Sequence, residues 1–197
     1  HLNILEDWIR KIKINKNILQ CGVHNPLDKD SSDTLLLSGI KPTQLHNNCA
    51  GKHLAMISGC LMHKQNINTY IKINHPYQKL IRETLEYFTD TNITKKQIGV
   101  DGCSAPQYSF PLNNVAISMI NLLKNYREEK KYSIETKILL DSITKYPHLT
   151  GSKKIYPSQL MKATNGAMFS KGGAEGVLLF AHKEKKLGGV IKVKDGN

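Results

Sequence analysis

Apolar residues recur at helical spacing along most of this 197-residue chain. A proline at position 76 is well placed to open one helix, because Leu80, Ile81 and Leu85 follow it at helical intervals and proline suits a first helical turn. Repeats of three and four residues predict the other helices in the same way. The predicted helices cover residues 2–14, 50–63, 76–88, 112–123 and 133–146.

Strand patterns are fewer and shorter. Residues 97–100 form a short apolar run that ends at Asp101, and residues 176–182 and 187–193 alternate like strands. The polar residues 183–186 join the last two segments into a predicted antiparallel hairpin. Helices followed by such a hairpin indicate an α+β (or α/β) fold. The length fits one domain, residues 1–197, with a sizeable core.

The charge balance is strongly basic, with a formal net charge of +12. The arginines are only Arg10, Arg82 and Arg127, and the remaining cations are lysines that accompany abundant isoleucine and asparagine. This composition is typical of genes with A+T-rich coding DNA. Arginine also binds phosphates and base edges more specifically than lysine does. We therefore expect no specific nucleic-acid partner, although a basic nucleic-acid-binding module stays an alternative.

Cysteine usage and hydropathy indicate the compartment. The four cysteines are unevenly spaced, which suits a reducing, cytoplasmic location better than a disulfide framework. No apolar run approaches the roughly 18 residues that cross a bilayer, so we expect no membrane partner.

Two stretches combine small residues with reactive side chains, residues 47–53 and 99–106. Cys49, Lys52 and His53 stand at i, i+3 and i+4, on one face if a helix begins near residue 50. The positive end of that helix is predicted to lower the pKa of Cys49. Cys103 follows a predicted strand, and two thiolates from such places could bind zinc. The alternative is that Cys49 and Cys103 are small buried apolar residues.

Further motifs extend along the chain around these two stretches: residues 21–26 (CGVHNP), 46–53 (HNNCAGKH), 75–78 (HPYQ), 100–106 (VDGCSAP), 146–151 (YPHLTG), 171–176 (KGGAEG) and 194–197 (KDGN). In these motifs, nearly all of the chain resembles the L-asparaginase II family, the group similar to the inducible asparaginase of rhizobia and unrelated in sequence to the threonine-dependent bacterial asparaginases. The resemblance implies hydrolysis of L-asparagine to L-aspartate and ammonia. It also implies helices packed on an antiparallel sheet, as in serine β-lactamases and penicillin-binding proteins. As the assembly we expect a homodimer.

A zinc site is the first implication of the resemblance for individual residues. Its ligands would be Cys49, Lys52 and Cys103, leaving a fourth position open. The lysine must be neutral to bind, and a bound dication in a desolvated pocket favours that form. The family motif usually has serine where this chain has Ala50.

Catalysis is the second implication. The family is thought to attack the amide with a serine that a lysine activates, and Lys171 matches one such lysine. Asp101 would bind the α-amino group of the substrate, and His53 would orient the substrate or a metal ligand. The alternatives are a surface lysine for Lys171, a turn-capping carboxylate for Asp101 and a buried helical histidine for His53.

One departure from the family concerns the nucleophile. The family's serines, one in an SxxK arrangement, lie upstream of the segment that His1 begins, and Ser142–Lys145 matches only the spacing. The chain is therefore expected to be truncated at both ends, lacking the nucleophile segment and the last helix, and to be inactive alone. A catalytically dead, zinc-binding remnant is the corresponding alternative.

Overall fold

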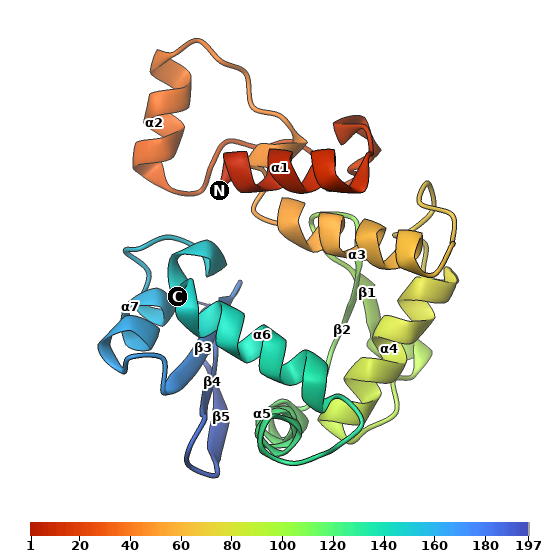
Figure 1. Cartoon of the computed structure of the whole chain (residues 1–197), viewed down its shortest axis with the longest axis vertical. Coiled ribbons are helices and arrows are strands. Elements are labelled where there is room, and N and C mark those ends of the chain that lie inside the picture. The colour runs from red at the N-terminus through yellow and green to blue at the C-terminus, as the bar shows by residue number, and fades with distance from the viewer. Residues whose placement is uncertain (197) are drawn as a thin grey trace. The chain divides into compact units, whose positions relative to one another are not determined.

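The chain folds into helices and small antiparallel sheets, which confirms the predicted α+β class (Figure 1). A computed structural model describes residues 1–196, and Asn197, the end of the KDGN motif, lies outside the described residues. The contacts divide the chain into two compact units. The first unit comprises residues 1–83 and 93–109, and the second comprises residues 84–92 and those from 110 onward.

The first unit is built on two helices that lie side by side, α1 (Leu2–Ile12) and α3 (Ala50–Met62) (Figure 1). The Trp8 indole on α1 donates a hydrogen bond to the Ser58 hydroxyl on α3 at 3.0 Å. The apolar face of α1 packs against the core, although none of its residues is fully buried. The most deeply buried apolar residues of α3 are Ala50, Leu54, Ile57 and Cys60.

Shorter elements complete the first unit. The helix α2 (Lys29–Leu37) has no buried residue. The first unit also contains three 3-10 turns, η1 (Lys16–Ile18), η2 (Gln44–His46) and η3 (Lys95–Gln97). The strand β1 (Ile98–Val100), predicted from its apolar run, pairs antiparallel with β2 (Pro106–Tyr108), which the sequence did not indicate. Their pairing brings residues 101–105 into a tight turn.

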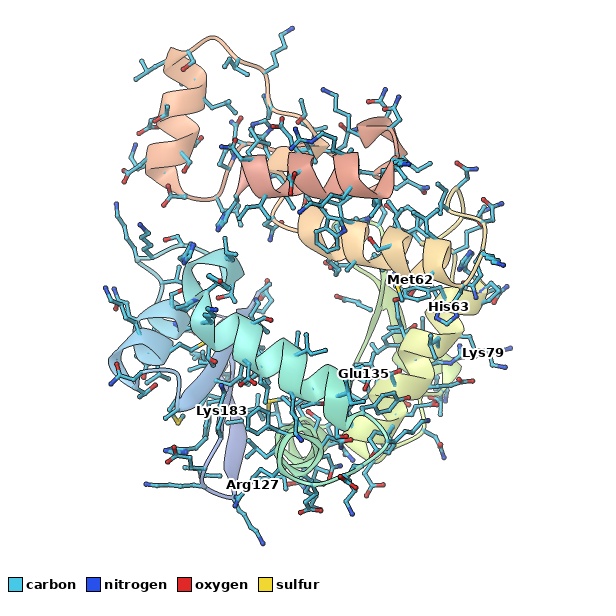
Figure 2. All side chains as sticks on the ribbon, in the orientation of Figure 1. Met62, His63, Lys79, Arg127, Glu135 and Lys183 are labelled. Atoms are coloured by element: carbon cyan, nitrogen blue, oxygen red, sulfur yellow. The ribbon has the colours of Figure 1, made fainter. Side chains whose placement is uncertain are left out.

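The end of α3 packs against the start of α4 (Pro76–Thr89), where Tyr77 lies close to a glycine of α3. A Cβ added at Gly59 would stand 2.0 Å from the Tyr77 ring and hydroxyl. The Tyr77 ring also contacts the ring of His63, labelled in Figure 2, with centroids 6.0 Å apart. We expect Gly59→Ala to lower the free energy of unfolding by about 1–3 kcal/mol, because overpacking forces neighbours to shift.

A matched control lies in the same helix. A Cβ at Gly51 would meet only Leu5, at an ordinary 3.9 Å. We therefore expect Gly51→Ala to be neutral or to stabilise by up to about 1 kcal/mol, as alanine does in helices. Urea denaturation of both variants checks the pair, and equal stabilities would contradict the close packing of Gly59 on Tyr77.

The second unit packs helices on a three-stranded antiparallel sheet, in the order β3 (Met168–Gly173), β4 (Val177–His182) and β5 (Leu187–Lys192). Its helices are α5 (Leu112–Arg127), α6 (Ser133–Lys145) and α7 (Tyr156–Ala163), with the 3-10 turn η4 (Pro147–Thr150). The buried core comprises Met119, Leu123, Leu140, Phe169 and Ala181. The predicted β4–β5 hairpin is confirmed, whereas β3 and α7 were not predicted.

The β4–β5 connection is tied to the helices (Figure 2). The ammonium of Lys183, whose side chain is only 14% exposed, donates to the Asp141 carboxylate at 2.8 Å and to the Thr144 hydroxyl at 2.7 Å. Arg127 donates to the carbonyl of Glu184 at 3.1 Å. These polar contacts fix the hairpin on α5 and α6, so the lysine-rich turn is more than a solvated connection.

Candidate functional site

The two reactive stretches of the sequence meet in the first unit. Cys49 is the N-cap residue of α3, and its amide donates to the Asn47 side chain at 2.8 Å. The buried Asn47 in turn donates to the carbonyl of Cys21 at 2.7 Å. This arrangement fixes the backbone just before α3, so Cys49 and Lys52 both lie at the first turn of the helix.

The β1–β2 turn supplies the other half of the site. The Asp101 amide donates to the Ala105 carbonyl, and the Ser104 amide donates to the Asp101 carbonyl, both at 2.8 Å. Ser104 takes a left-handed conformation with φ 69°, which tightens the turn. The buried Cys103 thiol donates to the Asp101 carboxylate at 3.3 Å.

One contact joins the two halves. The Lys52 ammonium donates to the Asp101 carboxylate at 2.6 Å, across 49 positions of sequence. The two side chains are 44% and 34% exposed, so the pair faces solvent. The structure thus brings Cys49, Lys52, Asp101 and Cys103 together at one edge of the first unit.

Three of these residues form a group that can hold a metal ion. The two thiol sulfurs of Cys49 and Cys103 and a carboxylate oxygen of Asp101 all lie within 4.8 Å of one another; we call them the Cys–Asp–Cys group. Thiolates and a carboxylate are donors that zinc accepts, at about 2.3 Å for sulfur and about 2.0–2.2 Å for oxygen. The donor set and its spacing therefore fit a zinc ion. The Lys52 nitrogen, in contact with the same carboxylate, is a further donor once it loses its proton.

The electrostatics of the group favour an ion pair. Burial lowers the pKa of Lys52, but hydrogen bonds to Asp101 and Cys103 raise it more, and the net pKa is raised. The hydrogen bond from Lys52 is the largest effect on Asp101 and lowers the pKa of its carboxyl. Lys52 is therefore an ammonium here, and binding a metal through its nitrogen requires the release of a proton and of the pair with Asp101.

The prediction of a depressed thiol pKa at Cys49 is wrong. Burial raises the pKa of Cys49, and this effect exceeds the lowering by the nearby Lys52 charge. Burial likewise raises the pKa of the neighbouring Cys21 to about 11. At Cys49, the free energy lost by removing a thiolate from water is larger than the stabilisation that the helix N-terminus and the Lys52 ammonium give to the thiolate.

His53 follows Lys52 on α3 and is fully buried. The Tyr70 hydroxyl accepts a hydrogen bond from the Gln20 amide at 2.8 Å and lies 2.6 Å from His53 Nδ1. Within the described part of the chain, Nε2 has no hydrogen-bond partner.

The burial of His53 makes stability depend on pH. Burial first, and the Lys52 charge second, lower the pKa of His53 from 6.5 to about 4. Between pH 6.5 and about pH 4, His53 is protonated in the unfolded chain but stays neutral in the folded chain. Protonation therefore favours the unfolded chain, and the free energy of unfolding falls as the pH falls from 6.5 toward 4. We expect the free energy of unfolding to fall by about 2 kcal/mol between pH 7 and pH 5 from this residue.

The measurement is urea denaturation of the chain and of His53→Gln at both pH values, with a chelator present. Glutamine keeps a polar partner for Tyr70 but does not titrate, so the variant should show a smaller loss between pH 7 and pH 5. A loss of the same size in the variant would place the titrating group elsewhere.

Lys171 lies in the second unit, on β3, where it pairs with Leu179 of β4. Its side chain is exposed, and the ammonium donates to the carbonyl of Gly172 at 2.5 Å. The preceding Ser170 is fully buried and donates to the Leu179 carbonyl at 3.1 Å. Lys171 therefore occupies a regular strand position, and its expected role as a base stays a prediction.

Sequence reasoning missed two parts of the site. It assigned Asp101 to substrate binding, whereas the structure also places its carboxylate among the candidate metal donors. The only signal was its position two residues before Cys103. It also missed Tyr70, for which no motif or periodicity was available.

The sequence was also compared with known proteins. A comparison with protein-family models matches residues 1–197 to the L-asparaginase II family. A search of curated proteins finds no match. No helix in the part of the chain that the structure describes is long and apolar enough to cross a membrane.

Proposed function

The chain belongs to the L-asparaginase II family, and on that basis we propose that it hydrolyses the side-chain amide of L-asparagine to L-aspartate and ammonia. The observation that carries the proposal is the family match over residues 1–197, together with the cluster formed by two of its motifs. A small-molecule amide is the substrate, and the protein acts as a homodimer in the cytoplasm.

The Cys–Asp–Cys group and Lys52 form the proposed zinc site. Cys49 and Cys103 would hold the ion through sulfur, with Lys52 as the third ligand and the Asp101 oxygen within reach of the same centre. When bound, zinc supplies a fixed positive charge that positions and polarises a polar group of the substrate. Because the ion favours the neutral amine, it would release Asp101 from its pair with Lys52.

Asp101 and His53 are the proposed substrate-binding residues. A carboxylate released from Lys52 can accept hydrogen bonds from the α-ammonium group of asparagine. Burial keeps His53 neutral and its Nδ1 contacts the Tyr70 hydroxyl, so Nε2 is the ring nitrogen left for a further hydrogen bond. It would donate to the substrate or orient one of the metal ligands.

Lys171 is the proposed base. As a neutral amine it would take the proton of a serine hydroxyl, whose oxygen then attacks the amide carbon. Ammonia leaves with a returned proton, and water hydrolyses the resulting ester to L-aspartate. The KGGAEG motif that carries Lys171 supports this role.

Ammonia release from L-asparagine tests the proposal, with L-glutamine as the comparison substrate. We expect turnover of roughly one per second or more, an ordinary enzymatic rate, from the protein expressed from its complete coding sequence. A chain that binds zinc without releasing ammonia would instead be a catalytically dead remnant. A chain that does neither but binds nucleic acid would be a basic binding module.

A further inference from the structure

The two thiols of the Cys–Asp–Cys group are placed for chemistry that amide hydrolysis does not use. The sulfur atoms of Cys49 and Cys103 lie within 4.8 Å of each other, and both residues are free cysteines. We propose that hydrogen peroxide oxidises this pair to a reversible disulfide between Cys49 and Cys103. The disulfide rests on the thiol geometry alone, whereas its competition with zinc rests on the proposed function.

Forming the disulfide requires the two sulfurs to come closer than they lie in the structure, where they are within 4.8 Å. A disulfide needs a sulfur–sulfur distance of about 2.05 Å, reached when both side chains adopt suitable rotamers. Cys49 lies at the start of α3, before the regular part of the helix, and Cys103 lies in the five-residue turn between β1 and β2. Because hydrogen bonds hold the backbone on both sides, the approach would come mainly from rotation of the two cysteine side chains, which leaves the helix and the strand pair intact.

Access to oxidant differs between the two thiols and sets the order of events. Cys49 is half-buried, whereas Cys103 is only 4% exposed. Peroxide therefore reaches Cys49 first. The Cys103 thiol is hydrogen-bonded to Asp101, and its sulfur lies within 4.8 Å of that of Cys49.

The chemistry balances with peroxide as the only oxidant. The thiolate form of Cys49, a minor fraction at neutral pH because burial raises its pKa, attacks one peroxide oxygen. The O–O bond breaks to give Cys49 sulfenic acid and hydroxide, and the hydroxide takes up the proton that the thiol released, which gives water. The Cys103 sulfur then attacks the Cys49 sulfur, the S–O bond breaks, and the hydroxyl group leaves as a second water. Two thiols lose two electrons and two protons, and one peroxide is reduced.

The other two cysteines are internal controls. Cys21 and Cys60 are buried, with 2% and 0% exposure, and neither belongs to the group. Cys60 lies on the same helix as Cys49 but 11 residues further on, about 16 Å along the axis. The Cys21 thiol points to the Gln44 carbonyl at 3.5 Å.

The test treats the reduced, chelator-stripped chain with stoichiometric hydrogen peroxide and maps its peptides without reduction. We expect a cross-linked pair of peptides containing Cys49 and Cys103, lighter by about 2 Da than the two thiol peptides and restored by dithiothreitol. Cys21 and Cys60 should remain alkylatable after unfolding. A disulfide that involves Cys21 or Cys60, a bond between two chains, or no disulfide at all would overturn the proposal.

Single variants distinguish the thiol that peroxide oxidises first, Cys49, from the thiol that then forms the disulfide, Cys103. In Cys103→Ser the disulfide should be absent, and dimedone should label the Cys49 sulfenic acid that has lost its partner. In Cys21→Ser the Cys49–Cys103 bond should form as in the parent chain. If dimedone did not label Cys49 in Cys103→Ser, Cys49 would not be the thiol that peroxide oxidises first.

Repeating the oxidation with zinc present distinguishes this inference from the proposed function. Preloading the chain with zinc chloride should slow formation of the disulfide at least about tenfold, because metal-bound thiolates are shielded from oxidant. An unchanged rate with excess zinc would refute the assignment of these thiols to zinc. The disulfide formed without zinc would still stand.

Discussion

The double variant Cys49→Ala, Cys103→Ala is expected to lose zinc. Two thiolates supply most of the bond strength in a site of this kind, and their sulfurs are two of the three atoms in the Cys–Asp–Cys group. We expect zinc affinity to fall by about 10³-fold or more, equivalent to about 4 kcal/mol. Metal content after dialysis and competition with a chromophoric chelator measure the effect.

The matched control removes the same number of thiols outside the group. Cys21→Ala, Cys60→Ala leaves Cys49 and Cys103 in place, and we expect it to retain about one zinc per chain. This control separates a ligand effect from a general loss of cysteine. Full zinc occupancy in the Cys49→Ala, Cys103→Ala variant would rule out the proposed centre.

The fold was predictable where one face of a helix is consistently apolar. α1, α3 and α6 begin at the predicted residues, and α5 runs four residues beyond its predicted end. α2 was missed because it buries none of its residues and shows no apolar face. β3 was missed because its second half, around Lys171, is a lysine between small residues instead of an alternating pattern.

The membership of the candidate site was more predictable than its interactions. The motifs identified Cys49, Lys52 and Cys103, and the structure brings the three residues together. The ion pair of Lys52 with Asp101 joins positions 49 residues apart, which no local pattern encodes. The pKa of Cys49 was predicted with the wrong sign because burial, the larger effect, depends on the tertiary packing of the first unit.

Replacing Lys171 by alanine is expected to abolish most of the asparaginase activity. A positioned base typically contributes about 10²–10⁴-fold to the rate, so we expect kcat to fall by that factor. Zinc content should not change, because Lys171 lies in the second unit and outside the Cys–Asp–Cys group. Ammonia release by the protein expressed from its complete coding sequence measures the first effect, and metal analysis measures the second.

Lys192 offers a closely matched control for Lys171. It is also an exposed strand lysine, and its ammonium contacts the carbonyl of the next residue, Val193, at 2.5 Å, as that of Lys171 contacts Gly172. A lysine that is merely a solvated strand residue would behave alike at both positions. We therefore expect Lys192→Ala to retain the parent kcat. If both variants kept a kcat close to that of the parent, Lys171 would have no catalytic role. An equal and large loss in both would indicate damage to the sheet, which thermal unfolding of each variant would reveal.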